Sequence, residues 1–156
     1  MSLLPLFEWM DAVPFFERSW QYVGPAVNLV HLLSMVVFAG AILIVDLRLL
    51  GPVLPRQPVR QVALDAQPWM VGGFVMLVIT GVPAVIATAL GEYYNPVFWF
   101  KMYTLLVATF FTFTVRHRVA RVDEARVGAV WGKVVALVSI GLWATVAASA
   151  RLIMLL

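Results

Sequence analysis

The 27 residues between Arg18 and Asp46 contain no Asp, Glu, Lys or Arg, and this uncharged run constrains the fold more than any other sequence feature. A helix needs only about 20 apolar residues to cross the hydrocarbon core of a bilayer. A second uncharged run lies between Asp65 and Glu92, and two more apolar runs follow it. Because the chain is 63% hydrophobic and only 12% charged, a water-soluble fold is excluded.

These runs predict an all-α protein, a bundle of four transmembrane helices in one integral-membrane domain that covers residues 1–156. Residues 1–20 alternate large apolar side chains with Glu8, Asp11 and Glu17, which predicts an amphipathic segment lying at the membrane surface. The chain has no cysteine, so disulfides, iron-sulfur clusters and covalently attached haem are excluded. The expected spans are 24–46, 68–90, 96–116 and 129–152.

The basic residues gather in the first and third loops, which lie on the same side of a four-span protein. The positive-inside rule therefore places these loops in the cytoplasm and both termini outside. The calculated pI of 9.7 reflects this orientation rather than nucleic-acid binding, because the net charge is only +3. The two loops and their edges hold eight of the eleven basic residues: Arg48, Arg56, Arg60, Arg116, Arg118, Arg121, Arg126 and Lys133.

Three cationic or ligating residues are expected at one depth in the outer leaflet: His31 on the first span, Lys101 on the third and Arg151 on the fourth. Imidazole is the strongest nitrogen ligand in a chain without cysteine. We therefore predict a b-type haem (heme b) with His31 as an iron ligand and with Lys101 and Arg151 paired to its propionates. Met35 and Met102 are near in depth, and either of them, or His31 of a second copy, could supply the sixth ligand.

Simpler roles for the same residues remain open. His31 could instead make an interhelical hydrogen bond to a Ser, a Thr or a backbone carbonyl, which stabilises membrane helices by about 0.6 kcal/mol on average. Lys101 and Arg151 could extend their charged ends to the outer interface. Asp46 and Arg48, at the inner end of the first span, are expected to cap the helix or pair at the interface.

His117 lies near the inner end of the third span, too far from His31 for one haem to join the two side chains. It could ligate a second, inner haem flanked by Arg116 and Arg118. The favoured interpretation is a cytoplasmic basic cap, because the positive-inside rule alone produces Arg-His-Arg at such a helix end.

No motif of a hydrolase, a nucleotide-binding loop or a metalloprotease is present. The expected partners are the lipid bilayer and further copies of the chain or a larger membrane complex, with quinone or a periplasmic redox protein as electron partner. The alternative is a non-catalytic accessory or scaffolding subunit without a cofactor. Its docking faces would carry small residues at i and i+4, as in Gly128 with Gly132 and Ala144 with Ala148.

Several short motifs resemble those of an uncharacterised bacterial family of small four-helix inner-membrane proteins. The resemblance implies a multi-pass protein of the bacterial inner membrane, with a histidine in the first span and another at the inner end of the third. A looser likeness connects the chain with copper-resistance CopD-like membrane domains and with four-helix b-type cytochromes. The matching segments are 4–9 (LPLFEW), 29–33 (LVHLL), 43–51 (LIVDLRLLG), Pro68-Trp69, Asn95-Pro96, Lys101-Met102 and His117.

Overall fold

The computed structural model describes residues 3–51, 53–54, 56–121 and 129–153, and these residues form helices and short connections without a strand. The all-α prediction is therefore confirmed. The elements are α1 (Leu4–Asp11), α2 (Pro14–Leu50), α3 (Val59–Ala87), α4 (Ala89–Tyr94), α5 (Pro96–Phe111), the π-helical turn η1 (Thr112–Arg116), α6 (His117–Arg121) and α8 (Ala129–Ile153).

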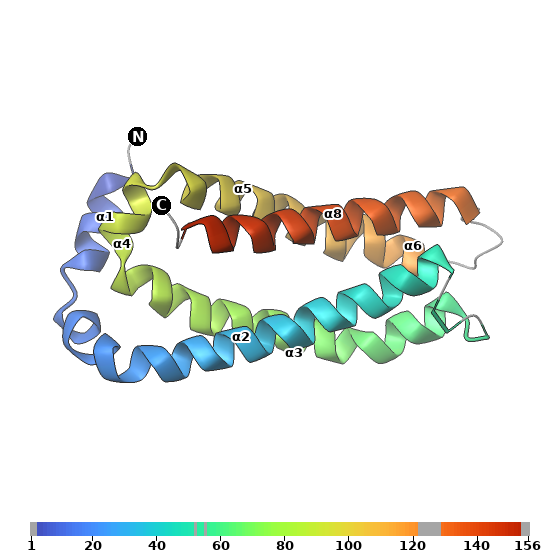
Figure 1. Ribbon diagram of the computed structural model, residues 1–156, viewed down its shortest axis with the longest axis horizontal. Helices are drawn as coiled ribbons and strands as arrows, with labels where there is room; N and C mark the ends of the chain where they lie inside the picture. Colours follow the sequence, from blue (N-terminus) through green and yellow to red (C-terminus); the bar gives the residue numbers. More distant parts are fainter. Residues whose placement is uncertain (1–2, 52, 55, 122–128, 154–156) are drawn as a thin grey trace.

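Four long apolar helical stretches form an antiparallel bundle, and each is long enough to cross a membrane. Figure 1 shows both termini, α1 and α4 at one end of the bundle, which we call the terminal end. The end of α2, the start of α3, α6 and the start of α8 lie at the opposite end, the loop end. The stretches with this length and hydropathy are Ser19–Leu50, Val59–Ala87, Pro96–Ala120 and Val130–Ile153.

Two of the helices extend well past the uncharged runs that predicted them. The first was expected to begin at residue 24, but α2 begins at Pro14 and continues through Pro25. The second was expected to begin at residue 68, but α3 begins at Val59 and contains Pro68. The start of an uncharged run indicates where the chain enters lipid. A helix, by contrast, continues as long as its backbone hydrogen bonds are satisfied, and it can therefore extend beyond that run.

Glycine ends α2 at the loop end. Gly51 has φ +106°, a left-handed conformation that glycine adopts without strain. Its N–H lies 3.1 Å from the Leu47 carbonyl oxygen and 3.2 Å from that of Arg48, so two carbonyls at the helix end are satisfied. The chain can then turn back within a few residues to begin α3.

The main core lies between α2 and α3 and extends to α6 and α8. Phe38 is its centre: its ring is 4.7 Å from the Trp143 ring and 5.6 Å from the Phe74 ring, measured between centroids. Gly73 on α3 lies against the backbone of Phe38, where an added Cβ would meet backbone atoms at 3.0 Å. The absence of a side chain at Gly73 therefore allows the close approach of α2 and α3.

A second apolar cluster closes the terminal end. Phe7 of α1 is buried there with Ala89 and Phe98, and its ring centroid is 5.2 Å from that of Tyr93. Trp9, on the other side of α1, remains 66% exposed. Part of the segment predicted over residues 1–20 is thus the short helix α1, which buries Phe7 in the bundle and leaves Trp9 exposed, whereas the residues from Pro14 on belong to α2.

Candidate functional site

His31 of α2 faces α3 and forms the interhelical hydrogen bond that sequence reasoning left open. Its Nδ1 lies 2.8 Å from Oγ1 of Thr80, a buried residue seven positions before the end of α3. Seven residues of helix span about 10 Å, so the pair lies about 10 Å from the terminal end of α3. His31 itself is only partly buried.

The Thr80 hydroxyl influences which His31 nitrogen carries the proton in the neutral ring. Thr80 Oγ1 lies 2.6 Å from the Met76 carbonyl oxygen, which can only accept a hydrogen bond. If the single hydroxyl proton is donated to Met76, Oγ1 accepts from Nδ1–H of His31, which is one of the two arrangements open to the neutral ring. Nε2 then keeps its lone pair, which is the state that a metal-ligating histidine needs.

Gly81 lies beside the edge of the His31 ring. A Cβ added to Gly81 would lie 3.3 Å from Cε1 of His31, which is closer than ordinary contact. The His31 ring is thus held between the Thr80 hydroxyl and the backbone of Gly81, which has no side chain to displace it. Consecutive residues of α3 therefore set the orientation of His31.

Charged residues near the terminal end complete the surroundings of His31. Lys101 of α5 lies within electrostatic range of both His31 and Glu92. Glu92 of α4 is partly buried, and its Oε2 is buried without a hydrogen-bond partner. Burial raises the pKa of Glu92 above its ordinary value, and the positive charge of Lys101 opposes this shift. An imidazole, an ammonium and a carboxyl from α2, α5 and α4 thus interact in one region.

The other residues predicted for the outer haem lie in different surroundings. Met35 is 38% exposed on α2. Met102 is partly buried and packs against the cluster of Phe7, Ala89 and Phe98. Arg151 is exposed on the last turn of α8. Lys101 is therefore the predicted residue that the structure brings into the electrostatic surroundings of His31.

A second polar site, near the loop end, involves Arg116, which sequence reasoning assigned to a basic cap. Its Nε donates to Oδ1 of Asp46 at 2.6 Å, and its Nη2 donates to the Ile42 carbonyl oxygen at 2.8 Å. Its Nη1 lies 3.6 Å from Sδ of Met70. Arg116 is 3% exposed and Asp46 is fully buried. Asp46 thus pairs, as one of the expected roles had it, but its partner is a buried arginine of another span and the pair is closed off from solvent.

The π-helical turn η1 explains how Arg116 enters the bundle. A π turn adds a residue to the helical repeat, which changes the direction of the side chains that follow it. Thr112 begins this turn and is fully buried, where its Oγ1 accepts a hydrogen bond from Trp143 Nε1 at 3.0 Å. Arg116 ends the turn and points into the core, while Arg118 in α6 is exposed.

One carboxylate oxygen at this second site lacks a hydrogen bond. Oδ2 of Asp46 is buried without a partner, as is the Oγ of Ser139 on α8. Ser139 lies beside the Asp46 carboxyl without forming a hydrogen bond of ordinary length. Residues of α2, α3, η1 and α8 therefore meet around one ion pair.

His117 begins α6 directly after this turn and is partly buried near the loop end. His31 and His117 thus lie at different levels of the bundle, on α2 and α6. Within the residues that the structure describes, no three His, Asp or Glu side chains gather into a metal-binding group.

The fold defines a class: an all-α membrane protein with four helices long and apolar enough to cross a bilayer and a histidine hydrogen-bonded between two of them. Within that class, the chain belongs to the family of unknown function DUF6644, whose profile matches residues 7–155. Comparisons with curated proteins and with solved structures give no match. The looser likeness to CopD-like domains and to b-type cytochromes therefore gains no support from them.

Proposed function

We propose that the protein is a membrane-embedded b-type haem protein that transfers electrons, with His31 as an iron ligand. The observation that carries this proposal is the hydrogen bond between His31 Nδ1 and Thr80 Oγ1, which leaves Nε2 outside this contact. Metal-ligating histidines almost always donate their other N–H to a partner that fixes the ring. Thr80 is such a partner, supplied by a neighbouring helix.

The chemistry around His31 suits this cofactor. Lys101 supplies a positive charge close to His31, and a cation neutralises a propionate that would otherwise lie uncompensated in the membrane. Methionine sulfur is a haem ligand in electron-transfer proteins. The exposed Met35, one helical turn beyond His31, and the His31 of a second copy are the two candidates for the sixth ligand. A bound haem would supply a one-electron iron couple.

The outer haem is preferred to a second, inner one. Each of the three nitrogen atoms of the Arg116 guanidinium already contacts a partner, namely Asp46, Ile42 or Met70. A haem propionate could bind Arg116 only by displacing this buried ion pair. Arg118 is exposed and His117 is partly buried. These residues fit a structural junction with a basic surface better than a second cofactor site.

We also propose that the loop end faces the cytoplasm of a bacterium and that the terminal end faces outward across the inner membrane. Arg48, Arg56, Arg60, Arg118 and Lys133 lie at the loop end, where the positive-inside rule expects them. The His31 site then lies in the outer half of the membrane. Quinol in the bilayer or a redox protein outside the membrane would exchange electrons with it.

Haem titration of the detergent-purified apoprotein tests the proposal. Wild type is expected to bind one b-type haem per chain or per two chains, with a Soret band and a pyridine haemochrome spectrum of protohaem. His31→Ala is expected to lose this binding, whereas His117→Ala is expected to retain it. His31→Gln is the matched variant for folding, since glutamine can still hydrogen-bond to Thr80.

A second candidate, an accessory subunit without a cofactor, is favoured by one observation. Ala144 and Ala148 are both exposed on α8, and Gly141 beside them has open space where a Cβ would lie. Small residues on an exposed face let another helix approach closely. Gly132, by contrast, is buried against Leu49, and Gly128 lies outside the described residues. A folded wild type that binds no haem, with His31→Gln equally stable, would support this second function.

A further inference from the structure

Asn28 is a polar side chain on an otherwise apolar face of α2. It lies nine residues after Ser19, inside the stretch Ser19–Leu50 that is long and apolar enough to cross a membrane, and it is exposed. It precedes His31 by three residues, or about 4.5 Å along the helix axis. The Asn28 amide is therefore presented at the surface of the bundle within an apolar span, where lipid tails offer it no hydrogen bond.

Hydroxyl groups in two other spans are hydrogen-bonded within their own helices, whereas the Asn28 amide is not. The hydroxyls of Thr104 and Thr145 donate to the carbonyl oxygens of Phe100 and Gly141, at 2.9 and 2.8 Å. The Asn28 amide has no hydrogen bond to any residue that the structure describes. An amide without a hydrogen bond is unfavourable in apolar surroundings. Asn28 therefore needs a partner from outside the bundle.

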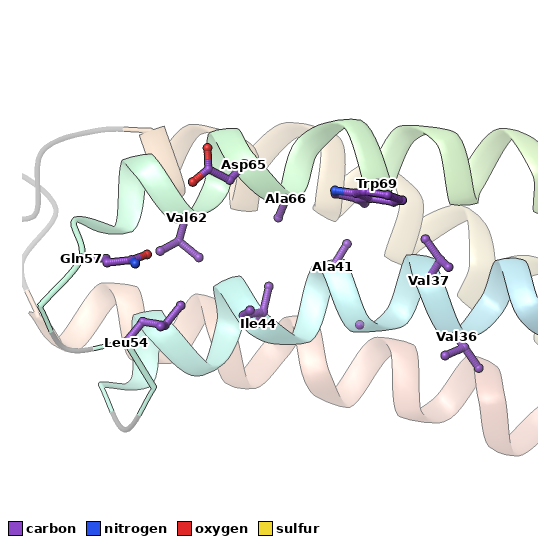
Figure 2. Close-up of a pocket in the computed structure, with 11 residues that line it drawn as sticks. Val36, Val37, Ala41, Ile44, Leu54, Gln57, Val62, Asp65, Ala66 and Trp69 are labelled. Atoms are coloured by element: carbon purple, nitrogen blue, oxygen red, sulfur yellow. The ribbon is translucent and has the colours of Figure 1, made fainter.

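Exposed residues continue from Asn28 along one side of α2. Leu32 and Val36 follow at intervals of four residues and are 54% and 67% exposed. At the open groove between α2 and α3, Figure 2 shows Val37 extending from α2 toward α3 and Val36 extending to the other side. Ala39 is also exposed, and it is small enough for a second helix to approach closely. These four exposed residues, which we call the α2 strip, form a ridge of the kind that packs against another helix.

We propose that two copies of the chain associate through the α2 strip, with their Asn28 amides hydrogen-bonded to each other across a twofold axis. Such an axis brings the same residue of both copies together. Each amide has both donors and an acceptor, so two of them can form two reciprocal hydrogen bonds. The pair would also fix the register of the two helices, since a shift along the axis leaves both amides unpaired. This association uses residues outside the contact between His31 and Thr80 and does not rest on haem binding.

Crosslinking in membranes tests which side of α2 faces the second copy. The chain has no cysteine, so a single introduced cysteine reports contact between copies. Leu32→Cys lies on the α2 strip, whereas Leu33, which is 59% exposed, lies about 100° further around the helix. On oxidation, Leu32→Cys is expected to form a disulfide-linked dimer, and the matched control Leu33→Cys is expected to form severalfold less of it. Equal crosslinking at the two positions would overturn the proposal.

Association in liposomes, measured by energy transfer between labelled copies as the lipid-to-protein ratio rises, tests the role of Asn28. Asn28→Leu is expected to raise the dissociation constant of the dimer about fivefold to thirtyfold. Asn28→Gln keeps an amide and should restore most of the affinity, while Thr145→Val, which removes a hydroxyl bonded within α8, should leave the affinity unchanged. A wild type that stays monomeric at every ratio, or equal association of wild type and Asn28→Leu, would overturn the proposal by assigning the amide to lipid headgroups or to another protein.

Discussion

Asp46 of α2 and Arg116 of η1, 70 residues apart in sequence, form an ion pair that is closed off from solvent. Arg116 also donates to the Ile42 carbonyl oxygen, while Met70 and Ser139 bring α3 and α8 to the same place. The pair therefore fixes how α5, through its π turn, sits against α2. Such a junction specifies one helix arrangement where apolar packing alone would allow several.

Breaking this pair is expected to destabilise the protein strongly. Arg116→Met leaves Asp46 as an uncompensated buried charge, and the expected loss is about 3–5 kcal/mol of unfolding free energy. The double variant Asp46→Leu with Arg116→Met removes both charges and should recover most of the loss. Unfolding in mixed micelles measures both. Arg118→Gln, which changes the exposed arginine two residues away, is the matched control, and an equal loss in that control would contradict the account.

Neighbouring glycines of α3 provide a second test. Gly73→Ala places a Cβ 3.0 Å from the backbone of Phe38, so α2 and α3 must separate, and a loss of about 1–3 kcal/mol is expected. Gly72→Ala adds the same methyl group where nothing lies within 4 Å, and its effect should stay within about 1 kcal/mol. Equal unfolding free energies for the two variants, measured in one detergent, would show that the helices do not approach closely at Gly73.

Thr80 is expected to position His31 rather than to contact a cofactor. Thr80→Val keeps the shape of the side chain but removes the hydroxyl that hydrogen-bonds to His31 Nδ1, so haem affinity should fall by about 10–100-fold. Thr104→Val removes a hydroxyl that donates only to its own helix, at the Phe100 carbonyl oxygen. Titration of both variants compares them directly, and an unchanged affinity in Thr80→Val would remove Thr80 from the site.

Glu92 is expected to make stability depend on pH. Because burial raises its pKa in the folded protein, the folded state binds more protons than the unfolded state between the ordinary value of 4.5 and the raised one. The free energy of unfolding should therefore fall as the pH rises above about 4.5. Glu92→Gln should remove this slope, and Lys101→Met should steepen it, because the lysine charge opposes the shift. A slope unchanged in Glu92→Gln would assign it to another group.

The sequence predicted the helices well because lipid imposes a simple rule on them. Each span needs enough apolar residues to cross the hydrocarbon core, and the uncharged run before Asp46 shows this without any knowledge of packing. The ends of α2 and α3 were less predictable. Pro25 and Pro68 look like helix starts in sequence, but each lies inside a longer helix whose true start, at Pro14 or Val59, has no stronger local signal.

Pairing between distant residues was the main feature that sequence reasoning missed. Arg116 stands in an Arg-His-Arg series, and nothing in the local sequence distinguishes the buried Arg116 from the exposed Arg118. The π turn that directs Arg116 inward depends on how Thr112 packs against Trp143, which no local pattern reveals. One signal was available: Asp46 ends an uncharged run, and an acidic residue in such a place needs a cation. For His31, the sequence suggested an interhelical hydrogen bond to a Ser, a Thr or a backbone carbonyl, but it could not identify Thr80 as the partner.

The most direct test of the central claim is the reduced-minus-oxidised absorption spectrum of the purified protein, after expression with added haem, for wild type and for His31→Ala. The account predicts a Soret shift and sharp reduced bands of a b-type haem in wild type, both absent in His31→Ala but present in His117→Ala. A colourless wild type that unfolds cooperatively, or a spectrum unchanged by loss of His31, would contradict it.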